Sequence, residues 1–264
     1  MQILESFIKG KMEDPNLCED LLVVTEDFVA VIDGVTSKTS KLINGKAGGK
    51  IAAETIGNTI RVMDKNISIR DFTKLITENI SRLYEKGEEK GYIAATVIIY
   101  SKERNEIWNI GDCQCIINEE KHLHEKKIDI ELSEKRVSFL KEALKNGITE
   151  EELLIKDIGR EQIILFLKEQ HKFANRECEY GYPVVNGSPI PESMIFVYKI
   201  NSGDEVILAS DGYPFLCNSL EESEKLLEKE LKENPLCYKN YKSTKGVSKG
   251  NCSFDDRTYV KFKA

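Results

Sequence analysis

The sequence predicts an α+β fold in which antiparallel sheets pack together and helices cover them on the outside. The links between the β-rich runs in the middle of the chain are only a few residues long, too short for the crossover that joins parallel strands. Strand and helix patterns do not alternate one for one, which argues against a doubly wound parallel sheet. The chain also lacks the GxGxxG and GxxxxGK(S/T) loops that bind phosphates in such folds.

The composition is that of a globular protein with enough apolar residues to bury a sizeable core. The 264 residues include 38 basic and 45 acidic side chains, so the formal net charge is −7, and 41% of the residues are hydrophobic. No run of about 18 apolar residues occurs, so we expect no membrane-spanning helix and no membrane partner. A net negative charge without a basic block argues against nucleic acid as a partner.

The sequence favours one domain over residues 1–264, because it contains no internal repeat, low-complexity tract or long linker. The N-terminus lacks the basic and apolar stretches of a secretory signal. The seven cysteines include no CxxC pair and are typical of reduced, buried thiols. The expected location is therefore the cytoplasm.

Two strands and two helices are predicted in the first third of the chain. Residues 21–25 and 28–33 are β-rich and are separated by two residues, which is the spacing of a hairpin. Apolar residues then recur at helical intervals, namely Ala52, Ile56, Ile60 and Met63. A second helix is predicted between Ser68, a candidate N-cap, and Gly87, which would end it.

Further strands and helices follow in the remaining two thirds. Strands are predicted over residues 92–100, 106–110, 114–118, 194–200, 205–210 and 258–262. Helices are predicted over residues 133–145, after Thr149, and over residues 220–234. Thr149 and Glu152 have the pattern of a capping box. Residues 180–191 contain two glycines and three prolines and are predicted to form an irregular loop.

Acidic residues stand where the predicted apolar strands begin or end. The positions are Glu19-Asp20, Asp33-Gly34, Asp211-Gly212 and Asp255-Asp256. Singly, each pair is typical of a turn or of a solvated surface. Together they predict a site, because converging carboxylates repel one another unless a cation compensates their charge.

Four of these carboxylates match the charge of two divalent cations: Glu19, Asp33, Asp211 and Asp255. Hard cations such as Mg²⁺ and Mn²⁺ prefer such oxygen ligands. Two-metal sites are suited to the in-line attack of an activated water on a phosphate ester. The sequence therefore predicts a metal-dependent hydrolase of phosphate esters.

The ordered motifs resemble those of the PP2C family of metal-dependent protein phosphatases. The residues that carry the resemblance are Glu19-Asp20, Val31-Ile32-Asp33-Gly34, Ala95-Thr96, Asn109-Ile110-Gly111-Asp112, Leu208-Ala209-Ser210-Asp211-Gly212 and Asp255-Asp256-Arg257-Thr258. They extend over essentially the whole chain. The resemblance implies a four-layer α-β-β-α sandwich, in which the helical and loop segment at about residues 130–191 is atypical.

By this resemblance, a defined set of residues would hold two metal ions. Asp33 would bridge both ions, the Gly34 carbonyl and a water held by Glu19 would complete one of them, and Asp211 and Asp255 would complete the other. A water between the ions would then attack phosphorus directly, without a phospho-enzyme. By the same resemblance, Asp20 would contribute to catalysis without binding a metal ion itself. Asp129 is the candidate ligand of a third ion.

The chain departs from the family pattern at three functional positions. Val35 stands where many members have a histidine that is a proposed general acid, and Pro15 stands where an arginine usually grips phosphate. Lys9 and Lys11 are the nearest cations, and either is a candidate replacement for that arginine, as a point charge in place of a bidentate fork. Asp256 replaces the usual asparagine, and we expect the adjacent Arg257 to neutralise it.

The leading hypothesis is a Mg²⁺- or Mn²⁺-dependent phosphatase of phosphoserine and phosphothreonine, whose substrate is a protein phosphorylated by a serine/threonine kinase. A second hypothesis is a catalytically weak regulatory module with the same fold, which the substitutions at Val35 and Pro15 favour. A third is a phosphatase of small phosphorylated metabolites.

Overall fold

The computed structural model describes residues 1–36, 42–85 and 91–264. It contains two five-stranded sheets whose neighbouring strands are all antiparallel. The first sheet has the order β1 (Gln2–Lys9), β10 (Arg257–Lys263), β9 (Glu205–Ala209), β6 (Gln114–Ile117), β7 (Glu120–His122). The second has the order β2 (Leu21–Val24), β3 (Phe28–Gly34), β4 (Ala95–Ser101), β5 (Glu106–Ile110), β8 (Phe196–Lys199). The predicted α+β class with two antiparallel sheets is confirmed.

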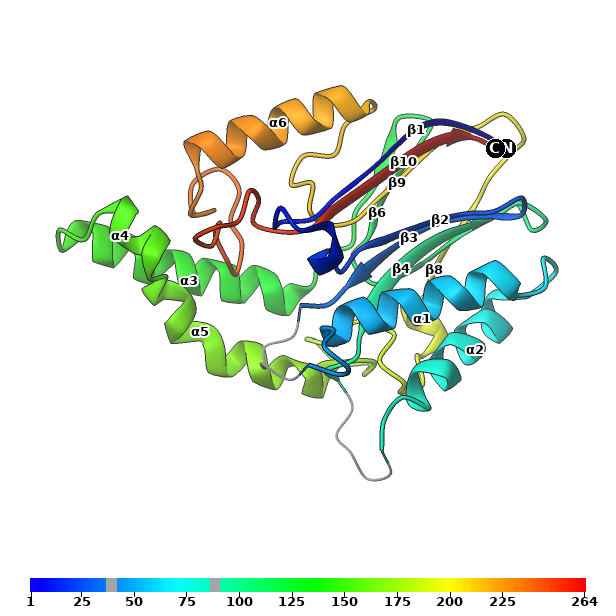
Figure 1. Ribbon diagram of the computed structural model, residues 1–264, viewed down its shortest axis with the longest axis horizontal. Coiled ribbons are helices and arrows are strands. Elements are labelled where there is room, and N and C mark those ends of the chain that lie inside the picture. The colour runs from blue at the N-terminus through cyan, green and yellow to red at the C-terminus, as the bar shows by residue number, and fades with distance from the viewer. Residues whose placement is uncertain (37–41, 86–90) are drawn as a thin grey trace.

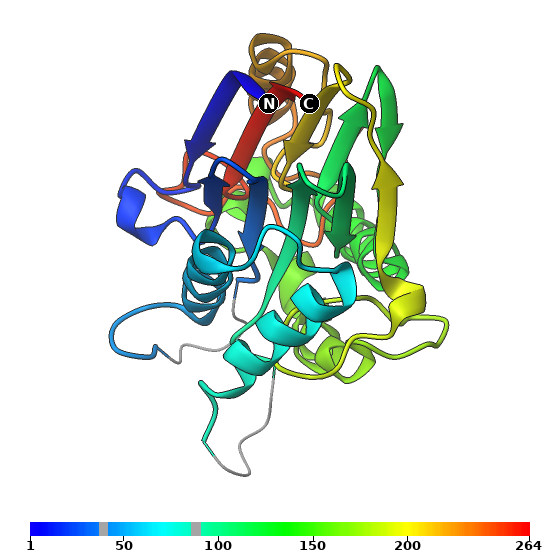
Figure 2. The same ribbon diagram turned by 90° about the vertical axis from the view of Figure 1, so that its right-hand side faces the viewer.

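Helices cover both outer faces of the packed sheets (Figure 1). On the β2–β8 sheet lie α1 (Gly48–Val62) and α2 (Ile69–Ser81), which run side by side in the view turned by 90° (Figure 2). On the opposite sheet lies α6 (Leu220–Glu233). At one end of the sandwich lie α3 (Lys127–Lys145), α4 (Glu150–Ile155) and α5 (Ile158–Glu169). Short 3₁₀ helices occupy Pro15–Leu17, Gln170–Phe173 and Glu192–Met194.

Strand β3 shows how one sequence serves two apolar cores. Val29 and Val31 face the other sheet and pack there against residues of β9 and β10. The alternate residues Phe28, Ala30 and Ile32 face α1 and α2. Because successive side chains of a strand point to opposite faces, this continuous apolar run is buried on both sides.

Most predicted elements are confirmed, with shifts at their ends. Ser68 caps α2 by accepting a hydrogen bond from the Asp71 backbone N–H, and the capping box of Thr149 and Glu152 is formed at α4. Helix α2 ends at Ser81, whereas Gly87, its predicted end, lies outside the described residues. The helix predicted from residue 133 begins earlier, at residue 127.

Strands β1 and β7 were not predicted. Strand β1 is an edge strand whose residues are exposed or half-buried, and its Leu4 and Ile8 side chains face solvent. Strand β7 consists of three polar residues, Glu-Lys-His. Strand β7 has no apolar residue, and the apolar residues of β1 fall on both of its faces, with Ile3 and Phe7 half-buried, so neither strand shows the apolar alternation of a half-buried strand.

The end segment of α3 to α5 is tied to the loop after α6 by a buried arginine. Arg136 of α3 has no exposed surface, and its guanidinium donates to the Asp157 carboxylate at 2.7 and 2.9 Å. It also donates to the carbonyl oxygens of Leu236 and Ser243 at 2.9 Å and of Cys237 at 3.3 Å. One side chain thus donates to three backbone carbonyls of residues 236–243, of which only that of Cys237 has a further backbone donor within the described residues, the Ser243 N–H at 3.2 Å.

None of the helices in the described parts of the chain combines the length and the apolar character needed to cross a membrane.

Candidate functional site

A cleft of about 530 Å³ opens where the ends of both sheets meet α3 and the loop after α6. Asp33, Asp211 and Asp255, far apart in the sequence, all line it. The predicted third-ion residue Asp129 lines the same cleft. The structure therefore brings together acidic residues that the sequence placed at separate strand ends.

The strands deliver these carboxylates by ordinary sheet pairing. Asp33 is the last side chain of β3 and lies opposite Thr96 of β4. Asp211 follows β9, and Asp255 precedes β10, the strand paired with β9. The pairing continues to the cleft, since the Ser210 backbone N–H donates to the Thr258 carbonyl oxygen at 3.0 Å.

Glu19 and Asp20 do not line the cleft but lie buried behind it. One oxygen of Asp20, Oδ2, accepts a hydrogen bond from the Thr258 hydroxyl at 2.9 Å. The other, Oδ1, is buried and has no partner within the described residues, and the same holds for Oε1 of Glu19. A buried carboxylate oxygen without a donor is costly, so these two atoms mark places that suit a cation or a water.

Two glycines allow the backbone to approach Glu19. A Cβ on Gly34 would lie 2.6 Å from the Glu19 carbonyl oxygen, and a Cβ on Gly49 would lie 2.7 Å from Glu19 Oε1. The start of α1, the end of β3 and Glu19 therefore fit together only without side chains at these two positions. Gly34, the predicted carbonyl ligand, is placed beside the acidic residues by this packing.

The acidic residues raise one another's pKa values. Burial, together with the neighbouring Asp211 carboxylate, raises the pKa of Asp33 well above its ordinary value. Burial and the nearby Asp255 raise the pKa of Asp211 to about 7. Burial raises the pKa of Asp20 to about 8, although the hydroxyl groups of Ser210 and Thr258 oppose that rise. Concentrated negative charge in a partly dry site favours a cation.

Lys11 supplies one such positive charge from within the chain. Its Nζ lies 3.4 Å from a Glu19 oxygen, 3.3 Å from an Asp255 oxygen and 3.1 Å from an Asp256 oxygen. The Thr36 hydroxyl lies 2.9 Å from the same nitrogen. Burial lowers the pKa of Lys11, but the surrounding carboxylates outweigh burial and hold the pKa above its usual value.

Two further lysines pair with acidic residues of the cleft. Lys245 forms an ion pair with the second oxygen of Asp255, and Lys126 forms one with Asp112 at 2.7 Å. Burial alone would raise the pKa of Asp255, but Lys245 and Lys11 outweigh it and lower the pKa. Asp255 therefore differs from Asp33 and Asp211, which form no side-chain hydrogen bond or ion pair with another described residue.

The expectation that Arg257 neutralises Asp256 is wrong. Arg257 pairs instead with Glu224, with two nitrogen–oxygen distances of 2.7 Å. Asp256 is balanced by Lys11, whose backbone N–H donates to it at 2.7 Å, and by the Glu19 backbone N–H at 3.0 Å.

Several residues at the cleft escaped the sequence prediction. Lys126, Lys245, Thr36 and His124 line it, and nothing in their sequence context separates them from solvated residues. The His124 ring stacks on Phe196 with a centroid distance of 3.5 Å. Their placement arises from the packing of distant segments, which local pattern does not report.

The chemistry of the donors fits a divalent cation, although their present spacing does not enclose one. Asp33 and Asp211 are acceptors that no described donor satisfies, and Glu19 Oε1 is buried and unpaired. Oxygen donors of this kind suit Mg²⁺ and Mn²⁺. In the described part of the chain, however, no three acidic, cysteine or histidine side chains stand close enough together to hold one ion.

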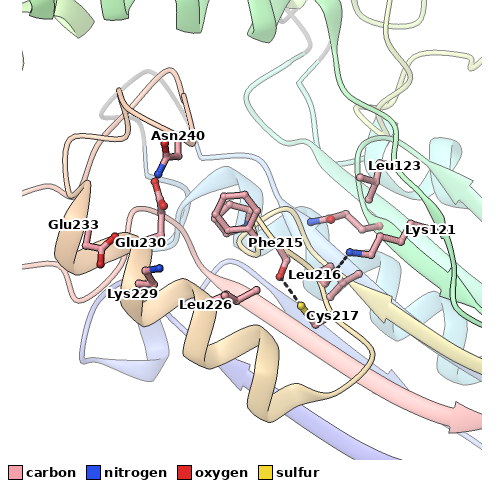
Figure 3. A pocket seen from close by; sticks show the side chains of 12 residues that line it. Lys121, Leu123, Phe215, Leu216, Cys217, Leu226, Lys229, Glu230, Glu233 and Asn240 are labelled. Carbon is pink, nitrogen blue, oxygen red and sulfur yellow. Dashed lines mark hydrogen bonds between the residues drawn. The ribbon is translucent and has the colours of Figure 1, made fainter.

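A second hollow of about 510 Å³ adjoins the cleft, with Gln114, Leu123, Pro214 and Asn240 lining both. Figure 3 shows its walls, which come from α6, from the loop after β9 and from Lys121 of β7. The Lys121 ammonium donates to the Leu216 carbonyl oxygen at 2.6 Å and so fixes the loop. The apolar side chains of Leu123 and Phe215 give this hollow a character different from that of the acidic cleft.

Similar solved structures are serine/threonine phosphatases of the PP2C type. The catalytic domain of the phosphatase PstP, in a structure with two manganese ions, is 15% identical, with 99% of this chain and 98% of that chain covered and a TM-score of 0.51. A structure of the PstP/Ppp phosphatase of Mycobacterium tuberculosis is 15% identical over 98% of this chain and 97% of that chain, with a TM-score of 0.49. RsbX with magnesium is 12% identical over 98% and 97%, with a TM-score of 0.47.

No family model matches the sequence, and no curated protein matches it. The likeness to the PstP catalytic domain shows that this chain has the PP2C fold.

Proposed function

We propose that the chain is a metal-dependent phosphatase of phosphoserine and phosphothreonine, acting on proteins that a serine/threonine kinase has phosphorylated. The observation that carries this proposal is the meeting of Asp33, Asp211 and Asp255, which reach one cleft from three strands of two sheets. The fold supports it, because PstP, a serine/threonine phosphatase of the same fold, carries two manganese ions.

Asp33, Asp211 and Asp255 would hold two ions, Mg²⁺ or Mn²⁺, with the Gly34 carbonyl and, through water, Glu19. When bound, such ions lower the pKa of a water and attract the phosphate of the substrate. Their positive charge would also relieve the repulsion that, in addition to burial, raises the pKa values of Asp33 and Asp211.

The remaining residues would position and balance this centre. Asp20, held by the Thr258 hydroxyl, would fix the start of β10 and with it Asp255. Asp129 remains a candidate for a third ion, beside the Lys126 ammonium, whose pKa it helps to raise. Lys11 remains a candidate for phosphate binding, although it would have to leave the carboxylates that it now contacts.

The test compares the wild-type chain with Asp33→Asn and with Asp64→Asn, a control that removes an exposed carboxylate outside the cleft. We expect Mn²⁺-dependent release of phosphate from phosphoserine and phosphothreonine peptides and from an aryl phosphate. Chelation abolishes it, Asp33→Asn lowers it by about a hundredfold or more, and Asp64→Asn leaves it unchanged. Turnover that survives both chelation and Asp33→Asn would contradict the mechanism.

A specific observation also favours the second hypothesis, a regulatory module with little turnover. Both oxygens of Asp255 are already engaged by lysines, and Val35 packs against an apolar cluster where an acid would be expected to stand. This alternative predicts stoichiometric binding of a phosphoprotein without measurable release of phosphate.

A further inference from the structure

The acidic centre contains positive charge that the chain itself provides. Asp255 is the carboxylate where this charge is concentrated, because Lys11 contacts its Oδ1 at 3.3 Å and Lys245 contacts its Oδ2. The Asp255 side chain is only 16% exposed, so the two ion pairs are shielded from water. Charged pairs in such surroundings are stronger than pairs at a free surface.

The two lysines differ in what else they hold. Lys11 also contacts Glu19, Asp256 and Thr36, so it joins several segments of the fold. The Lys245 ammonium has Asp255 as its ion-pair partner within the described residues. Replacing Lys245 therefore changes the charge at Asp255 with the least disturbance of other contacts.

The position of Lys245 is fixed by the helical end segment and does not result from a mobile side chain reaching inward. Arg136 of α3 donates to the Ser243 carbonyl at 2.9 Å, and Arg160 of α5 donates to the Thr244 carbonyl at 2.6 Å. The two carbonyls directly before Lys245 are thus anchored by two separate helices. An ammonium held in this way opposes a metal ion more effectively than one on a free loop.

We propose that Lys245 is a resident cation of the acidic centre, aided by Lys11, and that a divalent ion binds at Asp255 only by displacing the Lys245 ammonium. The inference rests on the proposed function, because the divalent ion is the one that this function requires. When a group of the protein itself occupies a site, the apparent affinity for a ligand equals the intrinsic affinity multiplied by the fraction of molecules in which the site is free. Removal of the ammonium should therefore strengthen the binding of the ion.

The test measures Mn²⁺ binding by calorimetry and by the electron paramagnetic resonance signal of free Mn²⁺. The variants are Lys245→Met, Lys245→Arg and the control Lys242→Met, which removes a charge from the same loop at a lysine that also lines the cleft but pairs with Glu134 and not with Asp255. We expect Lys245→Met to tighten Mn²⁺ binding by about ten- to a hundredfold, the value of one charged pair. Lys245→Arg and Lys242→Met should both stay within about threefold of wild type.

Equal affinities for Lys245→Met and Lys242→Met would overturn the proposal, as would weaker binding by Lys245→Met. Melting temperatures measured with and without Mn²⁺ show that each variant is folded and give a second readout of binding. If the wild type turns over phosphopeptide with Mn²⁺ and Lys245→Met binds no more tightly, this inference alone fails. If no variant binds Mn²⁺ and none turns over substrate, the proposed function fails with it.

Discussion

The buried guanidinium of Arg136 gives the most direct test of how the end segment is held. Arg136→Met keeps a long, helix-compatible side chain but removes every donor. It leaves the carbonyl oxygens of Leu236 and Ser243 without this donor, whereas the Cys237 carbonyl keeps the Ser243 backbone N–H at 3.2 Å. Asp157 keeps only the hydrogen bond from the Arg160 backbone N–H, at 2.8 Å.

The size of the effect follows from these contacts. Breaking a buried ion pair by removing one partner costs about 3–5 kcal/mol, and each buried polar group left without a partner costs roughly 1–3 kcal/mol. Asp157 is 21% exposed, so water can replace part of what its carboxylate loses. We therefore expect a loss of about 3 kcal/mol in the free energy of unfolding.

Urea unfolding measures the global loss, and amide hydrogen exchange over α3 to α5 and residues 236–243 measures the local one. The matched control is Lys141→Met, at an exposed position of the same helix. If Arg136→Met lies within about 1 kcal/mol of this control by both measurements, the arginine does not hold the segment as argued.

Three smaller predictions concern other contacts. Gly49→Ala would bring a Cβ within 2.7 Å of Glu19 Oε1, so we expect a loss of about 1–3 kcal/mol in thermal or urea unfolding. Burial would raise the pKa of Glu224, but Arg257 and other donors outweigh it and lower this pKa. The ion pair of Glu224 with Arg257 therefore stabilises the fold at pH values above the pKa that Glu224 has in the unfolded chain. This stabilisation is lost as the pH falls through the pKa that Glu224 has in the folded protein. Glu224→Gln should thus cost about 2 kcal/mol at pH 7, with a difference from wild type that shrinks below about pH 4. Thr149→Ala removes the capping box of α4 and should cost about 1 kcal/mol, visible as faster hydrogen exchange in that helix.

The sequence showed the central strands clearly, because each carries an apolar run buried on one or both faces. The edge strands β1 and β7 escaped prediction, because β7 contains no apolar residue and the apolar residues of β1 fall on both of its faces instead of alternating. The end of α2 was predicted too late, because Leu83 continues the apolar spacing although its side chain is 41% exposed.

The acidic residues of the candidate site could be predicted from the sequence, whereas its basic residues could not. Asp33 and Asp211 interrupt apolar strands and therefore attract notice in the sequence. Lys126 and Lys245 look like any of the chain's many solvated lysines, and their ion pairs arise only when loops from distant parts of the chain fold over the cleft. Sequence position reports which groups end a strand, but not which cations will face them.

The double burial of β3 has a consequence for how Asp33 is held. Because both faces of this strand are packed, a slip by one residue against β4 would exchange the side chains of two cores at once. Folding itself therefore fixes the position of Asp33 relative to β4 before any ligand binds. A ligand that binds at Asp33 therefore loses none of its binding free energy to a realignment of the strand.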